Sequence, residues 1–291
     1  MTRRYRFEGT LTSVTGLHVG SGQGDFSTDA RFVRTGDGRP YIPGSSFKGA
    51  LRSAVERMAA SLQGVGPGGM PLRTCLLDGS SGLGDPNCPT VHQGWQTAFS
   101  QAREKGLSEL DIERWLYQGV APFQDVTLCD TCRLFGSPYV ASKVAVQDLY
   151  LQAPTHTEVR HGVGIDRDTG TARAQIKFDY ETVPAQVAFE FRLLAESLTR
   201  RELGLLCCGL RQWEQGDVTL GGNSSRGLGG CELTLTHITE MELGSATAWL
   251  DRLLETRPEA ARGTTVHDGA AAVTTFMNSA IQALFQELGV T

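Results

Sequence analysis

The 291-residue sequence contains no apolar run that approaches the length of a membrane span, which is about 20 residues. Its first residues, MTRRYRFEGTL, are basic but pass directly into alternating polar and apolar positions, without the apolar core of a signal peptide. We therefore expect a cytoplasmic protein that makes no contact with a membrane. In that reducing compartment, the seven cysteines are expected as metal ligands or core residues before disulfides.

The sequence also lacks an excess of positive charge. It has 27 Lys and Arg against 32 Asp and Glu, a net charge of −5, which argues against binding nucleic acid by bulk charge. The distribution is uneven: residues 31–57 hold six basic and two acidic residues, whereas residues 240–291 hold seven acidic residues and three arginines. This pattern is compatible with a basic RNA-binding face and equally with ordinary solvated surfaces.

Several catalytic signatures are missing. There is no Ser-His-Asp signature and no Walker loop, and the glycine-rich GSGQGD at 20–25 does not open a helix directly, so it is not a dinucleotide-binding fingerprint. His18 and His161 have no obvious acid or nucleophile partner in the sequence, and we assign neither a role.

Glycine is abundant, at 35 residues, well above the usual share of about 7%. Gly20, Gly22 and Gly24 predict a loop whose N–H groups can approach a ligand without obstruction by Cβ atoms. Beyond Pro43, helical spacing over 46–62 predicts a helix. A helix start beside a glycine loop is suited to bind an anion, and phosphate is the obvious one.

Side chains around that helix start support the same interpretation. Ser45 and Ser46 are predicted N-caps, and Lys48 and Arg52 lie four residues apart near the helix start. A second glycine loop, GGNSSRGLGG at 221–230, suits a backbone that lies against a sugar-phosphate chain, although a flexible turn is an equally good interpretation of its composition.

Four cysteines predict a structural zinc site. Cys129 and Cys132 have the C-x₂-C spacing of a zinc knuckle, while Cys75 and Cys88 lie in a poorly periodic Gly- and Pro-rich region that resembles an insertion without its own core. Their pairing is inferred, because the 75–88 spacing is not a knuckle; His92 could replace Cys88, and four buried or free thiols remain the alternative. Cys207, Cys208 and Cys231 fall within regular elements and are expected in the core.

The order of the expected elements predicts an α+β fold of the ferredoxin-like or RRM-like kind. A strand around Tyr5–Leu11 precedes the helix at 46–62, and further strands fill 144–193 after a helical segment at 97–118. A capping box of Thr199 and Glu202 opens the next helix, 231–235 forms a last strand, and an amphipathic helix over 268–288 stops at Gly289. Nothing indicates a second independently packed domain, so we expect one domain over 1–291.

Four ordered blocks carry a family resemblance. They are HVGSG followed by Asp29 before ARFVR and by GRPYIPGSSFKGALR; CDTCRLFGS; EVRHGVGIDRDTGTARAQIKFDYETVPAQVAFEFRL; and TLGGNSSRGLGGCEL. Together they resemble the repeat-associated RNA-binding (RAMP) superfamily of CRISPR systems, in particular the backbone subunits of type III effector complexes. The resemblance implies an RRM-like palm with a β-hairpin thumb, here at about 155–183. It also implies a zinc-binding insertion at about 63–132, and a helical C-terminal extension covers about 240–291.

The same resemblance implies residue roles. The loop aspartate Asp29 is implied as catalytic with Mg²⁺, with Asp25 as its rival, whereas a turn residue that caps its own backbone is the alternative. Ile165 is a candidate apolar wedge between guide and target, and Asp166 is better explained as a turn-stabilising acid than as a catalytic one. The residues implied in RNA binding are Gly20, Gly22, Gly24, Ser45, Ser46, Lys48, Arg52, Arg160, Ile165, Arg167, Arg173, Gly222, Ser225, Arg226 and Gly227.

The resemblance therefore implies an antiviral CRISPR protein: a guide-RNA-binding backbone subunit of a type III effector that is also a metal-dependent endoribonuclease, a hydrolase of complementary target RNA. Its implied partners are the guide CRISPR RNA, single-stranded target RNA, other effector subunits and copies of itself, and its metals are structural Zn²⁺ and catalytic Mg²⁺. Two alternatives stay open. One is a non-catalytic RNA-binding scaffold, and the other is a guide-processing endoribonuclease, which needs an acid–base pair or a histidine.

Overall fold

The computed structural model describes residues 3–20, 22, 29–62, 66–75, 85, 87–92, 94–104, 106–118, 126–166, 168, 170–244, 246–253 and 263–290. None of the helices in these ranges is long and apolar enough to cross a membrane.

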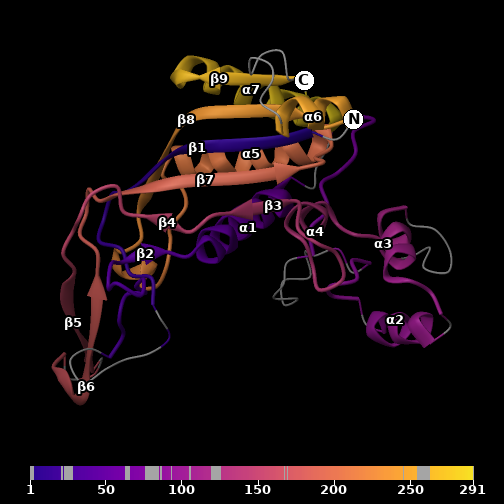
Figure 1. The fold of residues 1–291 in the computed structure, drawn as a ribbon. Helices are drawn as coiled ribbons and strands as arrows, with labels where there is room; N and C mark the ends of the chain where they lie inside the picture. The colour runs from indigo at the N-terminus through magenta and orange to yellow at the C-terminus, as the bar shows by residue number, and fades with distance from the viewer. Residues whose placement is uncertain are drawn as a thin grey trace.

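A five-stranded antiparallel sheet forms the palm (Figure 1). The long strand β1 pairs with β7 on one side and β8 on the other, and its alternating residues Tyr5, Phe7 and Leu11 are buried. The strand order is β3 (Val144–Val146), β7 (Ala188–Glu196), β1 (Arg3–Ser13), β8 (Cys231–Glu242) and β9 (Thr264–Asp268).

Two helices give the palm its connectivity. Helix α1 (Gly44–Ser61) follows β1, and α5 (Arg200–Glu214) connects β7 to β8. The elements β1, α1, β3, β7, α5 and β8 therefore follow the β-α-β-β-α-β order of a ferredoxin-like fold. Phe47 of α1 stacks on Trp213 of α5 at 4.4 Å between ring centroids, and both rings are fully buried. The predicted α+β fold is confirmed.

Local capping signals decide where α5 begins. The side chain of Thr199 accepts a hydrogen bond from the N–H of Glu202, and the Glu202 carboxylate accepts one from the N–H of Thr199, which completes the predicted capping box.

The chain after β8 is not only helical. Helix α6 (Ala246–Leu253) is followed by β9, which pairs with β8 at the sheet edge, and then by α7 (Gly269–Glu287). The prediction that 231–235 holds the last strand is therefore wrong. The predicted C-terminal helix is confirmed: it buries Val273, Met277, Ala280 and Leu284, and Gly289 follows its C-cap at a φ of +70°.

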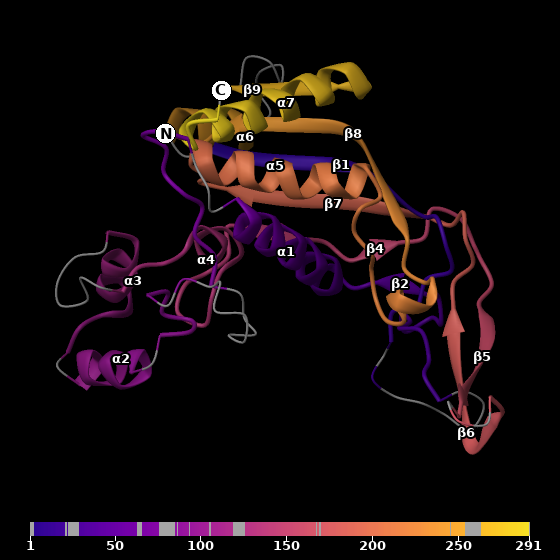
Figure 2. The same cartoon turned by 180° about the vertical axis from the view of Figure 1, so that it is seen from behind.

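The insertion lies at one end of the palm and contains α2 (Trp95–Glu104), α3 (Glu109–Gln118) and α4 (Asp130–Phe135) (Figure 2). The helical pattern at 97–118 belongs to two helices, and Gly106 between them has a φ of +82°. Contrary to the expectation of an insertion without a core, its cysteines pack with Trp95, Ile112, Leu116 and Leu128 in a separate buried cluster.

The thumb hairpin projects from the opposite end of the palm (Figures 1 and 2). It consists of β5 (Glu158–Ile165) and β6 (Ala172–Thr182), paired from Glu158↔Thr182 outward to the tip. A small ribbon of β2 (Tyr41–Ile42) and β4 (Leu149–Tyr150) lies between the palm and the thumb, beside the short helix η1 (Ser224–Arg226).

Candidate nucleic-acid interface and metal centre

The segment that carries Asp29 is attached to the thumb. The N–H of Ala30 donates to the Asp179 carbonyl at 3.1 Å, and the N–H of Glu181 donates to the Ala30 carbonyl at 2.9 Å. Ala30 therefore pairs in parallel with Tyr180, alongside β6. The hairpin and the predicted catalytic segment thus form one unit, which fixes Asp29 at the thumb base.

The Glu181 carboxylate stabilises this unit through three hydrogen bonds. Its carboxylate accepts hydrogen bonds from the Phe32 N–H at 2.9 Å, from the Arg34 guanidinium and from the Thr157 hydroxyl, and its side chain is 12% exposed. Burial alone would raise the pKa of Glu181, but these hydrogen bonds and the charge of Arg34 outweigh it and lower the pKa.

Asp29 itself is exposed at the edge of this unit. Its Oδ2 accepts a hydrogen bond from the Asp179 N–H at 2.8 Å. The carboxylate is therefore held by a strand 150 residues further along the chain and still faces solvent. Such a group is accessible to a bound RNA backbone.

His161 has a partner that the sequence did not reveal. Its Nδ1 lies 2.6 Å from Oδ1 of Asp179, directly across the hairpin, while the imidazole side chain is 78% exposed. The sequence shows no obvious acid partner for His161, and the register of β5 against β6 supplies one by bringing together residues 18 positions apart. His18 is also satisfied, but by the main chain: its Nδ1 lies 2.6 Å from the Glu181 carbonyl oxygen.

The two glycine loops meet around His18. The N–H of Gly222 donates to the His18 carbonyl at 2.9 Å, and Gly20 lies so near that a Cβ there would be 3.3 Å from His18 Nε2. Gly221 has a φ of +80°, and a Cβ on it would be 2.0 Å from the His18 carbonyl oxygen. The second loop therefore needs glycine at 221, and the structure joins the loops that the sequence shows 200 residues apart.

Aromatic and basic side chains line the other face of the thumb. Phe178 stacks near Tyr180, and the Arg226 guanidinium lies over the Phe178 ring at 4.9 Å. Arg160 extends to Gly16, where an added Cβ would be 2.7 Å from its Nη2. Of the predicted RNA-binding residues, those that gather at the thumb base and the two loops are Gly20, Gly22, Arg160, Gly222, Ser225, Arg226 and Gly227.

At the outer end of β5, Ile165 is 66% exposed, as a wedge requires. Oδ1 of Asp166 accepts a hydrogen bond from the Asp168 N–H at 2.9 Å, the geometry of the turn-stabilising role expected for it. Arg173 is part of β6, whereas Gly24, Asp25 and Arg167 lie outside the described residues.

The four predicted zinc ligands come together. One sulfur each from Cys75, Cys88, Cys129 and Cys132 lies within 4.8 Å of the others, and all four residues are buried. Among the described residues, no other group of three or more potential ligands is so close, and His92 is not part of it. Four buried cysteine sulfurs this close together could hold a metal in a closed, structural site, and zinc is the metal that such donors suit.

A family comparison is decisive for this combination of palm, thumb and glycine loops. The model of the RAMP superfamily matches residues 10–232, which include the Asp29 segment, both loops, the insertion and the thumb. The chain belongs to the RAMP superfamily. It is thus a CRISPR-associated RNA-binding subunit of a multisubunit complex. No curated protein matches this RAMP chain.

In this RAMP protein, the start of α1 differs from the prediction. The helix begins at Gly44 with Pro43 as N-cap, so Ser45 and Ser46 belong to its first turn and are not caps. The Asp148 carboxylate accepts a hydrogen bond from the Gly44 N–H at 2.8 Å, a contact between distant residues that no local pattern announces. An acidic side chain therefore already occupies part of the predicted anion site.

Lys48 and Arg52 of α1 are both hydrogen-bonded to residues of the segment 132–142. Lys48 donates to the Ser142 hydroxyl at 2.7 Å. Arg52 pairs with Glu56 at 2.8 Å, donates to the Gly136 carbonyl at 3.0 Å and lies 3.5 Å from Sγ of Cys132, and its side chain is 17% exposed. These contacts hold Arg52 beside the cysteine cluster. A phosphate contact by Lys48 or Arg52 stays a prediction.

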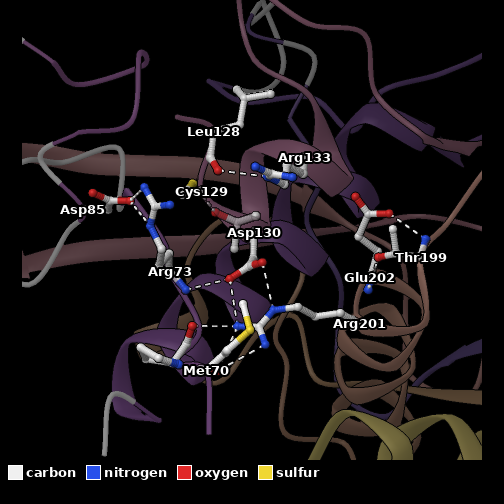
Figure 3. A network of polar contacts seen from close by, with 12 residues as sticks. Met70, Arg73, Asp85, Leu128, Cys129, Asp130, Arg133, Thr199, Arg201 and Glu202 are labelled. Carbon is white, nitrogen blue, oxygen red and sulfur yellow. Dashed lines mark hydrogen bonds and ion pairs between the residues drawn. The ribbon is translucent and has the colours of Figure 1, made fainter. Parts of the chain in front are cut away.

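A half-buried polar network links the cysteine cluster to the palm (Figure 3). Asp130, between the two knuckle cysteines, accepts hydrogen bonds from the Arg73 N–H at 2.8 Å and from Arg201 of α5 at 3.0 Å. Arg201 also donates to the carbonyls of Met70 and Pro71. The turn of the RAMP insertion that carries Cys129 and Cys132 is therefore held against α5.

The remaining cysteines belong to the palm core, as predicted. Cys207, Cys208 and Cys231 are buried, and burial raises the pKa of Cys208 and of Cys231 to about 12. They stay protonated near neutral pH and act as small apolar side chains.

Proposed function

We propose that this RAMP subunit binds the guide RNA of a type III CRISPR effector and cleaves complementary target RNA at Asp29. One observation carries the proposal: the exposed Asp29 carboxylate is fixed by the Asp179 N–H at the base of the thumb. A carboxylate held in that way is already in position when RNA binds to the thumb, so no further ordering of its segment is needed.

The surroundings of Asp29 supply the binding surface. Gly20, Gly22 and the 221–227 loop allow a sugar-phosphate backbone to approach the main chain, and Arg160 and Arg226 bring positive charge to the other face of the thumb. Base pairing between guide and target would carry the sequence specificity, so backbone contacts suffice for the protein.

Mg²⁺ would be held by Asp29 together with phosphate oxygens of the RNA and water. The donor set fits this use, because Mg²⁺ is commonly bound by one or two carboxylates plus substrate phosphates. Once bound, it would neutralise charge on the scissile phosphate. Asp29 would accept the proton of the neighbouring 2′-hydroxyl as its oxygen attacks the phosphorus, which gives a 2′,3′-cyclic phosphate and a 5′-hydroxyl.

The test is cleavage of an end-labelled, guide-complementary RNA by the assembled complex, with Mg²⁺ and with EDTA. The wild type is compared with Asp29→Ala and with Asp168→Ala, which removes an exposed carboxylate from the thumb tip. We expect cuts with the wild type and Asp168→Ala in Mg²⁺ alone. Cuts that persist in Asp29→Ala would assign cleavage to Asp25 or to another subunit.

If no protein cleaves while all retain guide and target, the subunit is a scaffold.

The His161–Asp179 pair gives a specific reason to test a second function, guide processing, which requires such an acid–base group. Cleavage of a precursor repeat RNA by the isolated protein, lost in His161→Ala, would establish that function instead.

A further inference from the structure

His161 and Asp179 lie beside Asp29 in one chain of contacts. The Asp179 N–H donates to Asp29, and the Asp179 side chain lies 2.6 Å from Nδ1 of His161. Adjacent strand-like segments are about 4.8 Å apart, so His161 is two such spacings from Asp29, on the order of 10 Å. Both groups can therefore reach the same bound RNA backbone.

We propose that His161 is a second catalytic residue of the RNA-cleaving site, a general acid for the leaving group, and that Asp179 positions it. The inference rests on the proposed function of Asp29. It is supported by the exposure of the ring, at 78% of its side chain, which leaves Nε2 accessible while Nδ1 is engaged by the carboxylate.

The roles follow from the chemistry of RNA cleavage. The 2′-oxygen forms a bond to phosphorus, and its proton passes to the Asp29 carboxylate. The bond between phosphorus and the 5′-oxygen breaks, and the proton on His161 Nε2 passes to that oxygen. Exchange with water then restores both groups. A positioned acid of this kind contributes about 10²–10⁴-fold to a rate.

Several charged side chains lie on the same face of the hairpin as the His161 ring. Across the hairpin on the same face, β6 presents Lys177, Asp179 and Glu181, and the docked segment presents Asp29. Glu181 is already paired with Arg34, so Asp179 is the acid in contact with the imidazole. A carboxylate in contact with Nδ1 of an imidazole fixes the orientation of the ring and leaves Nε2 directed to solvent.

A substrate with a sulfur leaving group distinguishes a general-acid role of His161 from a merely structural one. The assembled complex is given two targets: all-oxygen RNA, and RNA with a single bridging 5′-sulfur at the scissile phosphate, which departs without protonation. The proteins are the wild type, His161→Ala, Asp179→Asn, Asp29→Ala and His156→Ala, the last a matched control because its side chain, 80% exposed, also lies near the thumb base.

We expect His161→Ala to cleave all-oxygen RNA at least about 100-fold more slowly than the wild type but to cleave the sulfur substrate at nearly the wild-type rate. Asp179→Asn should lower the cleavage rate of all-oxygen RNA by a smaller factor, and the sulfur substrate should again restore it. Asp29→Ala should lower the rate on both substrates, and His156→Ala on neither. Guide retention by every variant reports on folding.

The inference is overturned if His161→Ala cleaves all-oxygen RNA at the rate of the wild type. It is also overturned if the substitution lowers the cleavage rate by the same factor on the all-oxygen and the sulfur substrate. If the wild type cleaves neither substrate, the proposed function fails and the inference fails with it. If Asp29→Ala alone is impaired, the proposed function stands without His161.

Discussion

The main-chain N–H of Asp179 donates a hydrogen bond to the carboxylate of Asp29 at 2.8 Å, and this contact is one of several that join the N-terminal glycine-loop region to the thumb. The amide fixes one carboxylate oxygen and leaves the residue exposed. Its structural and chemical contributions can be separated by substitution.

Asp29→Asn should keep the docking and lose the chemistry. The asparagine carbonyl oxygen can still accept the Asp179 hydrogen bond, whereas Asp29→Ala removes it and should lower the free energy of unfolding by about 1 kcal/mol. Thermal melts and cleavage assays of both variants test this expectation. If Asp29→Asn retains the cleavage rate of the wild type, its charge is not needed and the proposed role is wrong.

Zinc should be present at one ion per chain and should leave with a single ligand. Metal analysis of purified Cys129→Ser is expected to show no zinc, and a strong chelator should lower the melting temperature of the wild type, because the insertion core packs around the ligands. Cys208→Ser, in the palm core, is the matched control and should retain zinc. Full zinc in Cys129→Ser would contradict the assignment.

Arg52 offers a direct choice between two roles. Its contact with Cys132 predicts that Arg52→Gln binds zinc about 10–100-fold more weakly, as is typical for groups that support metal ligands. Lys48→Gln, on the same helix but hydrogen-bonded to Ser142, should leave zinc affinity unchanged. Competition with a chromogenic chelator measures both. Loss of guide affinity with unchanged zinc affinity in Arg52→Gln would favour the phosphate contact.

The Glu181 anchor should weaken in acid. Because its pKa is lower in the folded than in the unfolded protein, its stabilising contribution is complete above the ordinary value of 4.5 and is lost as the pH falls through the folded pKa. The Phe32 amide donates directly to this carboxylate, so its protection from hydrogen exchange should fall below about pH 4.5. In Glu181→Gln the protection should be independent of pH; a parallel fall there would assign the effect to other groups.

Gly221→Ala should disrupt the junction of the two loops. Alanine at a positive φ costs roughly 1–2 kcal/mol, and here its Cβ would also collide with the His18 carbonyl. Gly216 has a similar φ of +74° with open space around it, so Gly216→Ala isolates the cost of the backbone conformation. Unfolding by denaturant should show the larger loss for Gly221→Ala, together with weaker guide binding. Equal losses would mean that the close approach to His18 is not important.

Local patterns predicted local structure well. The Thr199–Glu202 capping box, the amphipathic C-terminal helix and strands in the predicted region 144–193 are all present, because each depends on residues close together in the chain. The start of α1 was missed because its polar partner, Asp148, lies 104 residues away.

Non-local contacts account for the rest of the candidate site. The cysteine cluster was predictable from thiol chemistry. The insertion's own buried core around Trp95, and the hydrogen bond from Arg201 to Asp130, depend on tertiary packing. The partnership of His161 with Asp179 depends on hairpin register, and β9 depends on an edge left free by β8. None of these contacts leaves a periodic signal in the sequence.

The most direct test of the account is to locate the scissile nucleotide on the protein. A target RNA with one photoreactive 4-thiouridine at the cleavage position is bound to the guide-loaded complex, irradiated, and the crosslinked peptides are identified. The account predicts crosslinks in residues 17–20, 29–34, 158–161 and 221–228, the segments that meet at the thumb base. Crosslinks confined to α2, α3 or α7 would contradict it.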